Sequence, residues 1–417
     1  MKIRSITYFC NPRYPFRSEV LQDAGRFLRT AREAYEAAGY EVQTTRLATV
    51  PFAQLLGEKL LNRLPTAAQE LELLLRQIAV EYASLGPALP QQPRSYEVIA
   101  EAMAGTQNVF FGGGLTQARG RHIDLEAVRK CAQVIVRCGP LAPNGFANLR
   151  FAALANVLPG SPFLPAAYHG GAAPAFAIAT EAADLAVQSF AQASTVSTGQ
   201  ARLTEAIQKH ADALSRTARA LTGRAISRGK TGPRTAARFL GIDFSLASFP
   251  DEATSLGNAF ERMGVARAGL HGSLAAAAVL TDAVDRARFR RTGFNGLMLP
   301  VMEDATFAKR AADGSLSIKD LLMYSAVCGT GLDTIPLPGD TTEAQIAAVL
   351  LDLAALALRL DKPLTARLMP IPGKKAGDAT GFDFAFFSNS RVMHLDAEAV
   401  GGPLAAGGPI PLRSRRS

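Results

Sequence analysis

The chain has 417 residues, which is enough for one large domain or two ordinary ones, and 48% of them are hydrophobic. Its net charge is +9 (45 Lys and Arg against 36 Asp and Glu), but the basic residues are scattered, so the charge argues against a nucleic-acid partner. The four cysteines lie far apart without a C-x-x-C pair, which indicates a reduced, cytoplasmic protein rather than one stabilised by disulfides.

No stretch has the pattern of a secretory signal or of a membrane span. Residues 2–9 alternate like a β-strand instead of forming a basic stretch followed by an apolar core. The most apolar predicted helix, residues 345–360, is too short to span a bilayer and carries Asp352 and Arg359. We therefore expect no membrane partner.

The first third of the chain predicts strands alternating with helices. Alternating β-forming residues predict strands at 2–9 and 41–47, and the helix between them ends at Gly39. A third strand, residues 108–114, runs into three glycines that can approach a phosphate; no G-x-G-x-x-G pattern follows, so a plain loop is the alternative. Apolar periodicity predicts helices at 18–38, 52–62, 66–84 and 95–104, with a Pro- and Gln-rich connector at 86–93.

The middle third contains a loop of unusual composition. Residues 159–169 include three prolines and end at His169. A loop this rigid is expected to hold something in place. Around it we predict helices at 125–137 and 200–221 and strands at 146–156 and 175–180. The basic stretch 224–238 comes next, without the interleaved aromatic residues of a nucleic-acid stacking surface.

The last third continues the alternation of strands and helices. Residues 340–343 have the pattern of a helix capping box. We predict strands at 239–244, 297–302, 332–336 and 364–370, and helices at 252–263, 269–286, 317–327 and 345–360. Regular alternation over most of the chain predicts an α/β fold with a mainly parallel sheet, either open or closed into a barrel.

Carboxylates recur where the predicted strands end. They are Glu181, Asp243, Glu303, Asp304 and Asp333. Because parallel strands end at one edge of a sheet or one mouth of a barrel, we expect these side chains to converge. An oxygen-rich set suits a divalent cation, so we predict Asp243, Asp304 and Asp333 as ligands of Mg²⁺, Mn²⁺ or Ca²⁺. The alternative is that each carboxylate caps a helix.

Two histidines and one cysteine are candidates for chemistry. His271 opens a predicted helix, and His169 closes the proline-rich loop; either can act as an acid or base near neutral pH. Cys328 stands between a helix end and a strand, where a thiolate can act as a nucleophile, although a helix carboxyl end raises a thiol pKa. We predict His271, Glu303 and Cys328 as catalytic and His169 as substrate-binding; structural roles are the alternative.

The turn at residues 372–378 carries Lys374 and Lys375 between glycines, directly after a predicted strand. Two lysines in such a turn can bind a carboxylate or a phosphate. The helix start at residues 339–342 offers free backbone N–H groups, which we expect to lie nearby. We therefore predict that Lys374 and Lys375 bind a small anionic molecule; a solvated loop is the alternative.

Five specific motifs resemble an uncharacterised bacterial and archaeal family, the domain of unknown function seven-eleven, sometimes labelled "pyruvate formate-lyase family protein". The resemblance implies a fold similar to that of glycyl radical enzymes. In that fold two parallel half-sheets form a barrel of about ten strands, with helices outside and a site at the centre. The motifs are Gly241–Ala247, Gly269–Ser273, Pro300–Asp304, Val327–Asp340 and Leu368–Asp378.

The chain departs from glycyl radical enzymes in the residues that carry their chemistry. The radical loop pattern Arg-Val-x-Gly-Tyr is absent, since Arg391-Val-Met-His-Leu has no glycine, and no paired cysteines occur. We therefore expect an enzyme of unassigned reaction that acts on a small anionic metabolite in a central pocket, not a glycyl radical lyase. A non-catalytic ligand sensor or assembly partner is the alternative. We also expect a single domain over residues 1–390, an irregular tail over 391–417, and a homo-oligomer.

Overall fold

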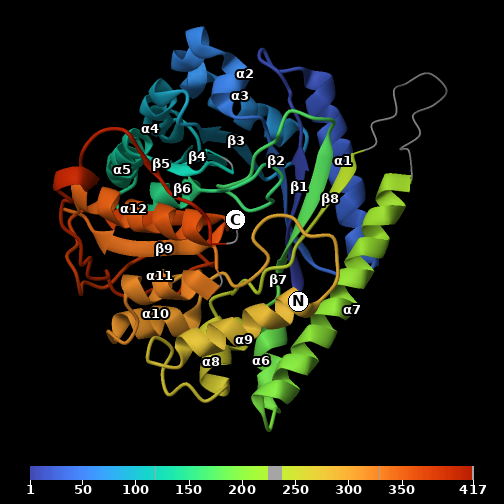
Figure 1. Cartoon of the computed structure of the whole chain (residues 1–417). Helices are drawn as coiled ribbons and strands as arrows, with labels where there is room; N and C mark the ends of the chain where they lie inside the picture. The colour runs from blue at the N-terminus through green and yellow to red at the C-terminus, as the bar shows by residue number, and fades with distance from the viewer. Residues whose placement is uncertain (118, 224–236, 328, 416–417) are drawn as a thin grey trace.

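The computed structural model describes residues 1–117, 119–223, 237–327 and 329–415. Most of the basic stretch 224–238 and Cys328 lie outside the described residues. In the part of the chain that is described, nine strands form one sheet in the order β8-β7-β1-β2-β3-β4-β6-β10-β9. The helices lie around this sheet, on the periphery of the molecule (Figure 1).

The sheet is mostly parallel, as the alternation of elements predicted. Its five central strands run in one direction. They are β1 (Lys2–Phe9), β2 (Val42–Ala48), β3 (Tyr82–Ala88), β4 (Val109–Gly114) and β6 (Phe151–Ala155). At each edge a parallel pair runs in the opposite direction. These pairs are β7 (Ala175–Glu181) with β8 (Arg238–Asp243), and β10 (Leu364–Ile371) with β9 (Gly331–Pro338).

The two edges of the sheet are both contacted by the segment 297–300. Leu297 forms a parallel bridge with Leu246, just past β8, and Pro300 forms one with Asp333 of β9. These are isolated bridges rather than a strand, so the strand predicted at 297–302 is not formed. The result is a mixed nine-stranded sheet; closure into a ten-stranded barrel is not shown by its pairing.

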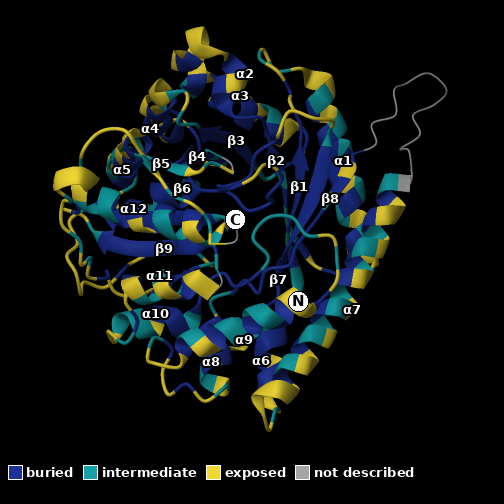
Figure 2. Cartoon of the chain, in the orientation of Figure 1, coloured by how far each residue is buried: buried dark blue, intermediate teal, exposed yellow. Residues whose placement is uncertain are grey.

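The helices bury one face against the sheet and expose the other (Figure 2). In α1 the buried residues include Leu21, Ala24, Leu28 and Ala31, at the spacing of one helix face. Phe27 of the same helix packs against Phe176 of β7, with ring centroids 4.8 Å apart. The helices are α1 (Ser18–Ala37), α2 (Phe52–Leu56), α3 (Leu64–Gln77), α4 (Ile99–Ala104), α5 (Leu125–Cys138), α6 (Ala183–Ala191), α7 (Val196–Gly223), α8 (Leu256–Arg262), α9 (Ser273–Arg286), α10 (Ala305–Ala312), α11 (Ile318–Val327) and α12 (Glu343–Leu360).

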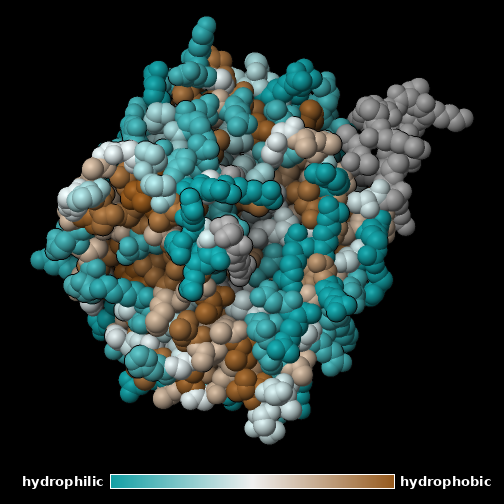
Figure 3. All heavy atoms as spheres, in the orientation of Figure 1, coloured by the Kyte–Doolittle hydropathy of each residue, from teal (hydrophilic) through white to brown (hydrophobic). Residues whose placement is uncertain are grey.

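The outer surface of the helices is unevenly polar. On the face drawn in Figure 3, hydrophilic side chains cover α7, whereas apolar side chains are seen around α11 and α12. None of the described helices is both long and apolar enough to cross a membrane. The predicted irregular tail includes a short strand, β11 (Pro409–Pro411), which pairs with β5 (His122–Asp124).

Several predicted elements differ from those observed. Residues 82–88 form the central strand β3, where a helix end and a connector were expected, and the short helices α6 and α10 were not predicted. The capping box of α12 begins at Thr342 rather than at the predicted Asp340. The side chains of Thr342 and Gln345 bond each other's backbone N–H groups.

The proline-rich loop between β6 and β7 is buried rather than exposed. Its residues Leu164 and Ala167 pack with Phe9 of β1 and Ala177 of β7. The Thr7 hydroxyl donates a hydrogen bond to the Pro162 carbonyl (3.2 Å). A loop inside a fold must satisfy its backbone groups locally, so this one acts as part of the core.

Tyr168 anchors the buried loop. Its ring is 7% exposed within an apolar cluster, and its hydroxyl donates to the Val157 carbonyl (2.9 Å). We expect Tyr168→Ala to lower the free energy of unfolding by about 3 kcal/mol, because it leaves a cavity and an unpaired carbonyl. Urea unfolding followed by circular dichroism measures this. Leu158→Ala, at a position that is 39% exposed, is the control and should change stability by less than about 0.5 kcal/mol.

Candidate functional site

A network of buried charges joins four strands and the segment before α10. Arg4 of β1 donates to Glu303, which directly precedes the N-cap of α10, and to Glu181 of β7 (3.4 Å). Arg367 of β10 donates to Glu303 (2.8 Å) and to Asp333 of β9 (2.5 Å). The three carboxylates and Arg367 are each no more than 5% exposed. The convergence predicted for the strand-end carboxylates is therefore observed for three of the five.

Two irregularities in strand pairing lie at residues of this network. Arg4 is an extra residue of β1 opposite the step from Thr180 to Ala179 in β7. In β9, Asp333 and Thr334 together face the single residue Arg367 of β10. Thr334 has φ = 47°, which is unusual for a β-branched residue. Such bulges re-aim side chains and are common beside functional sites.

Glu303 is the electrostatic centre of the network. Burial alone would raise the pKa of its carboxyl, but the charges of Arg4 and Arg367 outweigh burial and hold this pKa below its usual value. Burial raises the pKa of Asp333, and the charge of Glu303 adds to that rise. Glu303 is thus held as a carboxylate between two guanidinium groups. This arrangement suits a group that positions arginines; the catalytic role predicted for Glu303 stays a prediction.

A cavity of about 480 Å³ opens onto this network. Its charged and phenolic lining comes from Arg4, Arg46, Tyr82, Arg150, Glu303 and Arg367, and its other polar lining from Gln43, Thr44, Gln107 and Asn108. Its aromatic lining comes from Phe110, Phe146, Phe163, Phe384 and Phe386. Arg367 also lies over the ring of Phe163, from the buried loop, at 5.6 Å from its centroid. We call this space the arginine cavity.

Arg46 of β2 is the cavity arginine whose two terminal nitrogens bond no described residue. Its Nε donates to the Thr44 hydroxyl (2.9 Å), and among the described residues it has no carboxylate partner. Arg150 also forms no ion pair with a described residue, but its terminal nitrogens donate to the Thr106 hydroxyl and to the Met103 and Val109 carbonyls. Burial, together with the charge of Arg4, lowers the pKa of Arg46 to about 9. The charge of Glu303 acts in the opposite direction and raises this pKa. At neutral pH Arg46 is therefore a cation without an ion-paired carboxylate among the described residues, and its terminal N–H groups can hold a carboxylate or phosphate.

The predicted anion-binding lysines are not part of the arginine cavity. Lys374 and Lys375 are exposed in the turn after β10. The turn does lie close to the helix start at residues 339–342, as expected, because the Gly339 N–H donates to the Lys374 carbonyl (2.9 Å). His271 is exposed before α9, and the ring of the buried His169 bonds the Ala172 carbonyl (2.8 Å). None of these four lines the cavity.

The predicted metal ligands hold backbone segments in place. Asp243 accepts hydrogen bonds from the backbone N–H groups of Phe294 and Asn295. Asp304 is the N-cap of α10 and Asp333 binds Arg367, so the helix-capping alternative holds for Asp304. The described part of the chain contains no cluster of three or more His, Cys, Asp or Glu side chains able to hold a metal. The predicted cation site is thus not assembled by these residues.

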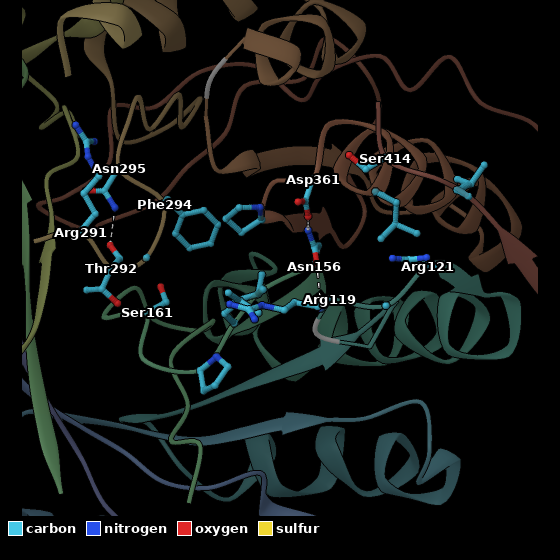
Figure 4. Close-up of a pocket in the computed structure, with 18 residues that line it drawn as sticks. Arg119, Arg121, Asn156, Ser161, Arg291, Thr292, Phe294, Asn295, Asp361 and Ser414 are labelled. Atoms are coloured by element: carbon cyan, nitrogen blue, oxygen red, sulfur yellow. Dashed lines mark hydrogen bonds between the residues drawn. The ribbon is translucent and has the colours of Figure 1, made fainter. Parts of the chain in front are cut away.

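A second cavity, of about 730 Å³, lies where β6 and α12 end (Figure 4). Asn156 bridges its wall: its Oδ1 accepts from the Arg119 backbone N–H (3.2 Å) and its Nδ2 donates to Asp361 (3.1 Å). Arg119, Asn156, Asn295 and Asp361 all have positive φ. However, the side chain of Asn156 is used in holding turns, and the cations Arg119 and Arg121 are exposed. The third cation, Arg291, is half-buried and donates to the Val284 and Ala287 carbonyls. We therefore assign the candidate site to the arginine cavity.

The cavity arginines were missed by reasoning from the sequence. The available signal was a charged residue in the middle of a mostly apolar strand, as at Arg367. Charged side chains are seldom buried without a partner, so such a position predicts a buried carboxylate facing it. Arg4 carries no such signal, because its strand alternates and also contains Lys2, Ser5 and Thr7.

Comparison with known proteins gives a family but no activity. The family model described as "Uncharacterised ACR (DUF711)" matches residues 1–388. A UPF0210 protein of Pyrobaculum aerophilum is 34% identical over 322 residues, which cover 76% of this chain and 68% of the relative. A UPF0210 protein of Pelotomaculum thermopropionicum is 29% identical over 405 residues, which cover 93% of this chain and 87% of the relative. One of Neisseria meningitidis is 28% identical over 363 residues, which cover 85% of this chain and 79% of the relative.

Proposed function

Because the chain belongs to the DUF711 family of uncharacterised proteins, whose name carries no reaction, we propose a function from its own geometry. We propose that it is an enzyme that acts on a small anionic metabolite in the arginine cavity. The observation that carries this proposal is Arg46, a half-buried cation in an open cavity, without an ion-paired carboxylate among the described residues. A ligand anion would supply the missing charge.

The neighbouring groups would then act on the bound molecule. Arg4 and Arg367, held in place by Glu303, would stabilise negative charge that develops during a reaction. Tyr82 lines the same cavity and offers a hydroxyl as a proton donor. We also propose that the segment 297–300 completes the sheet into a closed barrel around this cavity, since it bridges both edges.

A non-catalytic ligand sensor is the second candidate. It is favoured by the pairing of Glu303, which is bound by two arginines and so is not free to act as a general base. An enzyme and a sensor share the binding step, but only the enzyme converts the bound molecule. If a bound anion is recovered unchanged by NMR after prolonged incubation with the whole protein, the protein is a sensor.

Binding is tested with Arg46→Gln and, as a matched control, Lys374→Gln. We expect one or more of acetate, phenylacetate, succinate and inorganic phosphate to raise the melting temperature of the wild type by several degrees. Arg46→Gln should abolish this response, and Lys374→Gln should leave it unchanged. Removing an uncompensated buried charge should not lower the melting temperature of the unliganded protein, so a lost response cannot be ascribed to unfolding.

The opposite pattern would overturn the proposal. If Lys374→Gln removes the response and Arg46→Gln retains it, the anion binds at the turn 372–378. If no anion stabilises the wild type, the arginine cavity is not an anion site.

A further inference from the structure

The arginine cavity has an aromatic wall as well as a cationic one. Phe146, Phe384 and Phe386 line it and are each half-buried, so part of each ring remains accessible. The centroids of Phe146 and Phe384 are 5.0 Å apart, and those of Phe384 and Phe386 are 5.2 Å apart. Accessible aromatic surface in a concave space is a binding surface for an apolar group.

Two members of the aromatic wall, Phe384 and Phe386, are carried by a loop that hydrogen bonds hold in place. The ends of the segment 380–390 are joined by hydrogen bonds between Thr380 and Ser390 (2.9 and 2.8 Å). Phe382 and Phe387 anchor its middle and are buried. The Ser388 N–H donates to the Met302 carbonyl (2.7 Å), next to Glu303. Preorganisation of this kind lowers the entropic cost of binding.

The cationic wall has room for one further negative charge. Arg4 and Arg367 already bind carboxylates, whereas Arg46 does not. The bond from its Nε to Thr44 fixes the guanidinium plane and leaves both terminal nitrogens without a partner among the described residues. A planar fork of this kind matches the two oxygens of a carboxylate.

We propose that the ligand of the arginine cavity is an aromatic monocarboxylate. Its carboxylate binds the terminal nitrogens of Arg46, and its ring packs on Phe384 and Phe386. This rests on the proposed function and names the chemical class of its ligand. A dianion would place a second charge against the aromatic wall without a partner, and a neutral aromatic amide would leave Arg46 uncompensated.

Calorimetric titration of the full chain with four probes tests this class. The probes are phenylacetate, phenylacetamide, acetate and succinate. We expect phenylacetate to bind at least tenfold more tightly than acetate or succinate, and phenylacetamide to show no binding. The ring is worth this factor because it removes aromatic surface from water on both molecules.

Variants separate the two walls. Phe384→Leu combined with Phe386→Leu should weaken phenylacetate binding about tenfold and leave acetate binding within about twofold. Phe289→Leu, a half-buried phenylalanine outside the cavity, is the matched control and should bind like the wild type. Arg46→Gln should abolish binding of both acids. Leucine keeps the wall apolar, so the double variant is expected to fold, which its melting temperature checks.

The outcomes distinguish failure of the proposed ligand class from failure of the proposed anion-binding function. If anions bind through Arg46 but phenylacetate binds no better than acetate, the aromatic class is wrong and the anion site stands. If succinate or phosphate binds most tightly, the monocarboxylate class is wrong. If no acid binds the wild type, both proposals fail.

Discussion

Replacing Glu303 with glutamine is expected to lower the free energy of unfolding by about 3–5 kcal/mol. Glu303 is 4% exposed and accepts hydrogen bonds from both Arg4 and Arg367. Glutamine keeps the shape but removes the charge that two guanidinium groups share. Both cations then stay in a desolvated position without enough negative charge around them. Urea unfolding of the wild type and Glu303→Gln, followed by circular dichroism, measures the loss.

The difference in stability between the wild type and Glu303→Gln is expected to depend on pH. The pKa of Glu303 lies below its usual value in the folded chain, so its contribution to stability is fully present above the pKa of an unfolded glutamate, about 4.3. The contribution is lost as the pH falls through the lower, folded pKa. We therefore expect the difference in stability between the wild type and Glu303→Gln to be constant near neutral pH and to shrink below about pH 4.

Asp333→Asn is the matched control for this prediction. Burial raises the pKa of Asp333, and Arg367 keeps its bond to Glu303 when Asp333 is neutral. We expect this substitution to cost about 1–2 kcal/mol, clearly less than Glu303→Gln. An equal or larger loss in Asp333→Asn would contradict the central position of Glu303 in the network.

Local periodicity was sufficient to predict most elements of the fold. The strand at 2–9 and the helix from Ser18 were predicted at the observed positions, because alternation and a helical stripe are local properties. The strand β3 was missed because the helix before it, α3, ends at Gln77 without a glycine to mark the end; the left-handed position that follows is taken by Ala79, with φ = 55°. In addition, β3 itself contains Gly86 and Pro87, which are typical of turns.

The candidate site depends on contacts that no local pattern contains. Glu303 and Asp333 were predicted to converge because parallel strands share their ends. They do meet, but through Arg367 and the isolated bridge between Pro300 and Asp333, since residues 297–302 form no strand and Asp333 lies near the start of β9. Their arginine partners could not be predicted, because the bulges at Arg4 and Thr334 arise from pairing with residues far away in the chain. The lysine turn 372–378 had the right composition for an anion site, but it lies on the exposed side of the strand end.

Replacing Asp304, which was predicted as a metal ligand, is the second substitution expected to have a large effect on stability. The Asp304 carboxylate accepts hydrogen bonds from backbone N–H groups at the N-termini of two helices. It accepts from the N–H groups of Thr306 and Phe307 in α10 and from that of Leu256 in α8. The hydroxyls of Ser248 and Ser255 donate to it as well, each at 2.6 Å. The carboxylate is fully buried, so water cannot replace these bonds.

Asp304→Ala is therefore expected to cost about 3–5 kcal/mol, since it leaves several buried donors unpaired, among them the first N–H group of α8, and removes the cap of α10. Asp340→Ala is the control. Asp340 was predicted to cap α12, but Thr342 holds that position, and Asp340 is exposed. We expect Asp340→Ala to change the free energy of unfolding, measured with urea, by no more than about 0.5 kcal/mol. A loss below about 1 kcal/mol for Asp304→Ala would show that the donors find other acceptors. A loss that depends on added Mg²⁺ would instead restore the predicted role of Asp304 as a cation ligand.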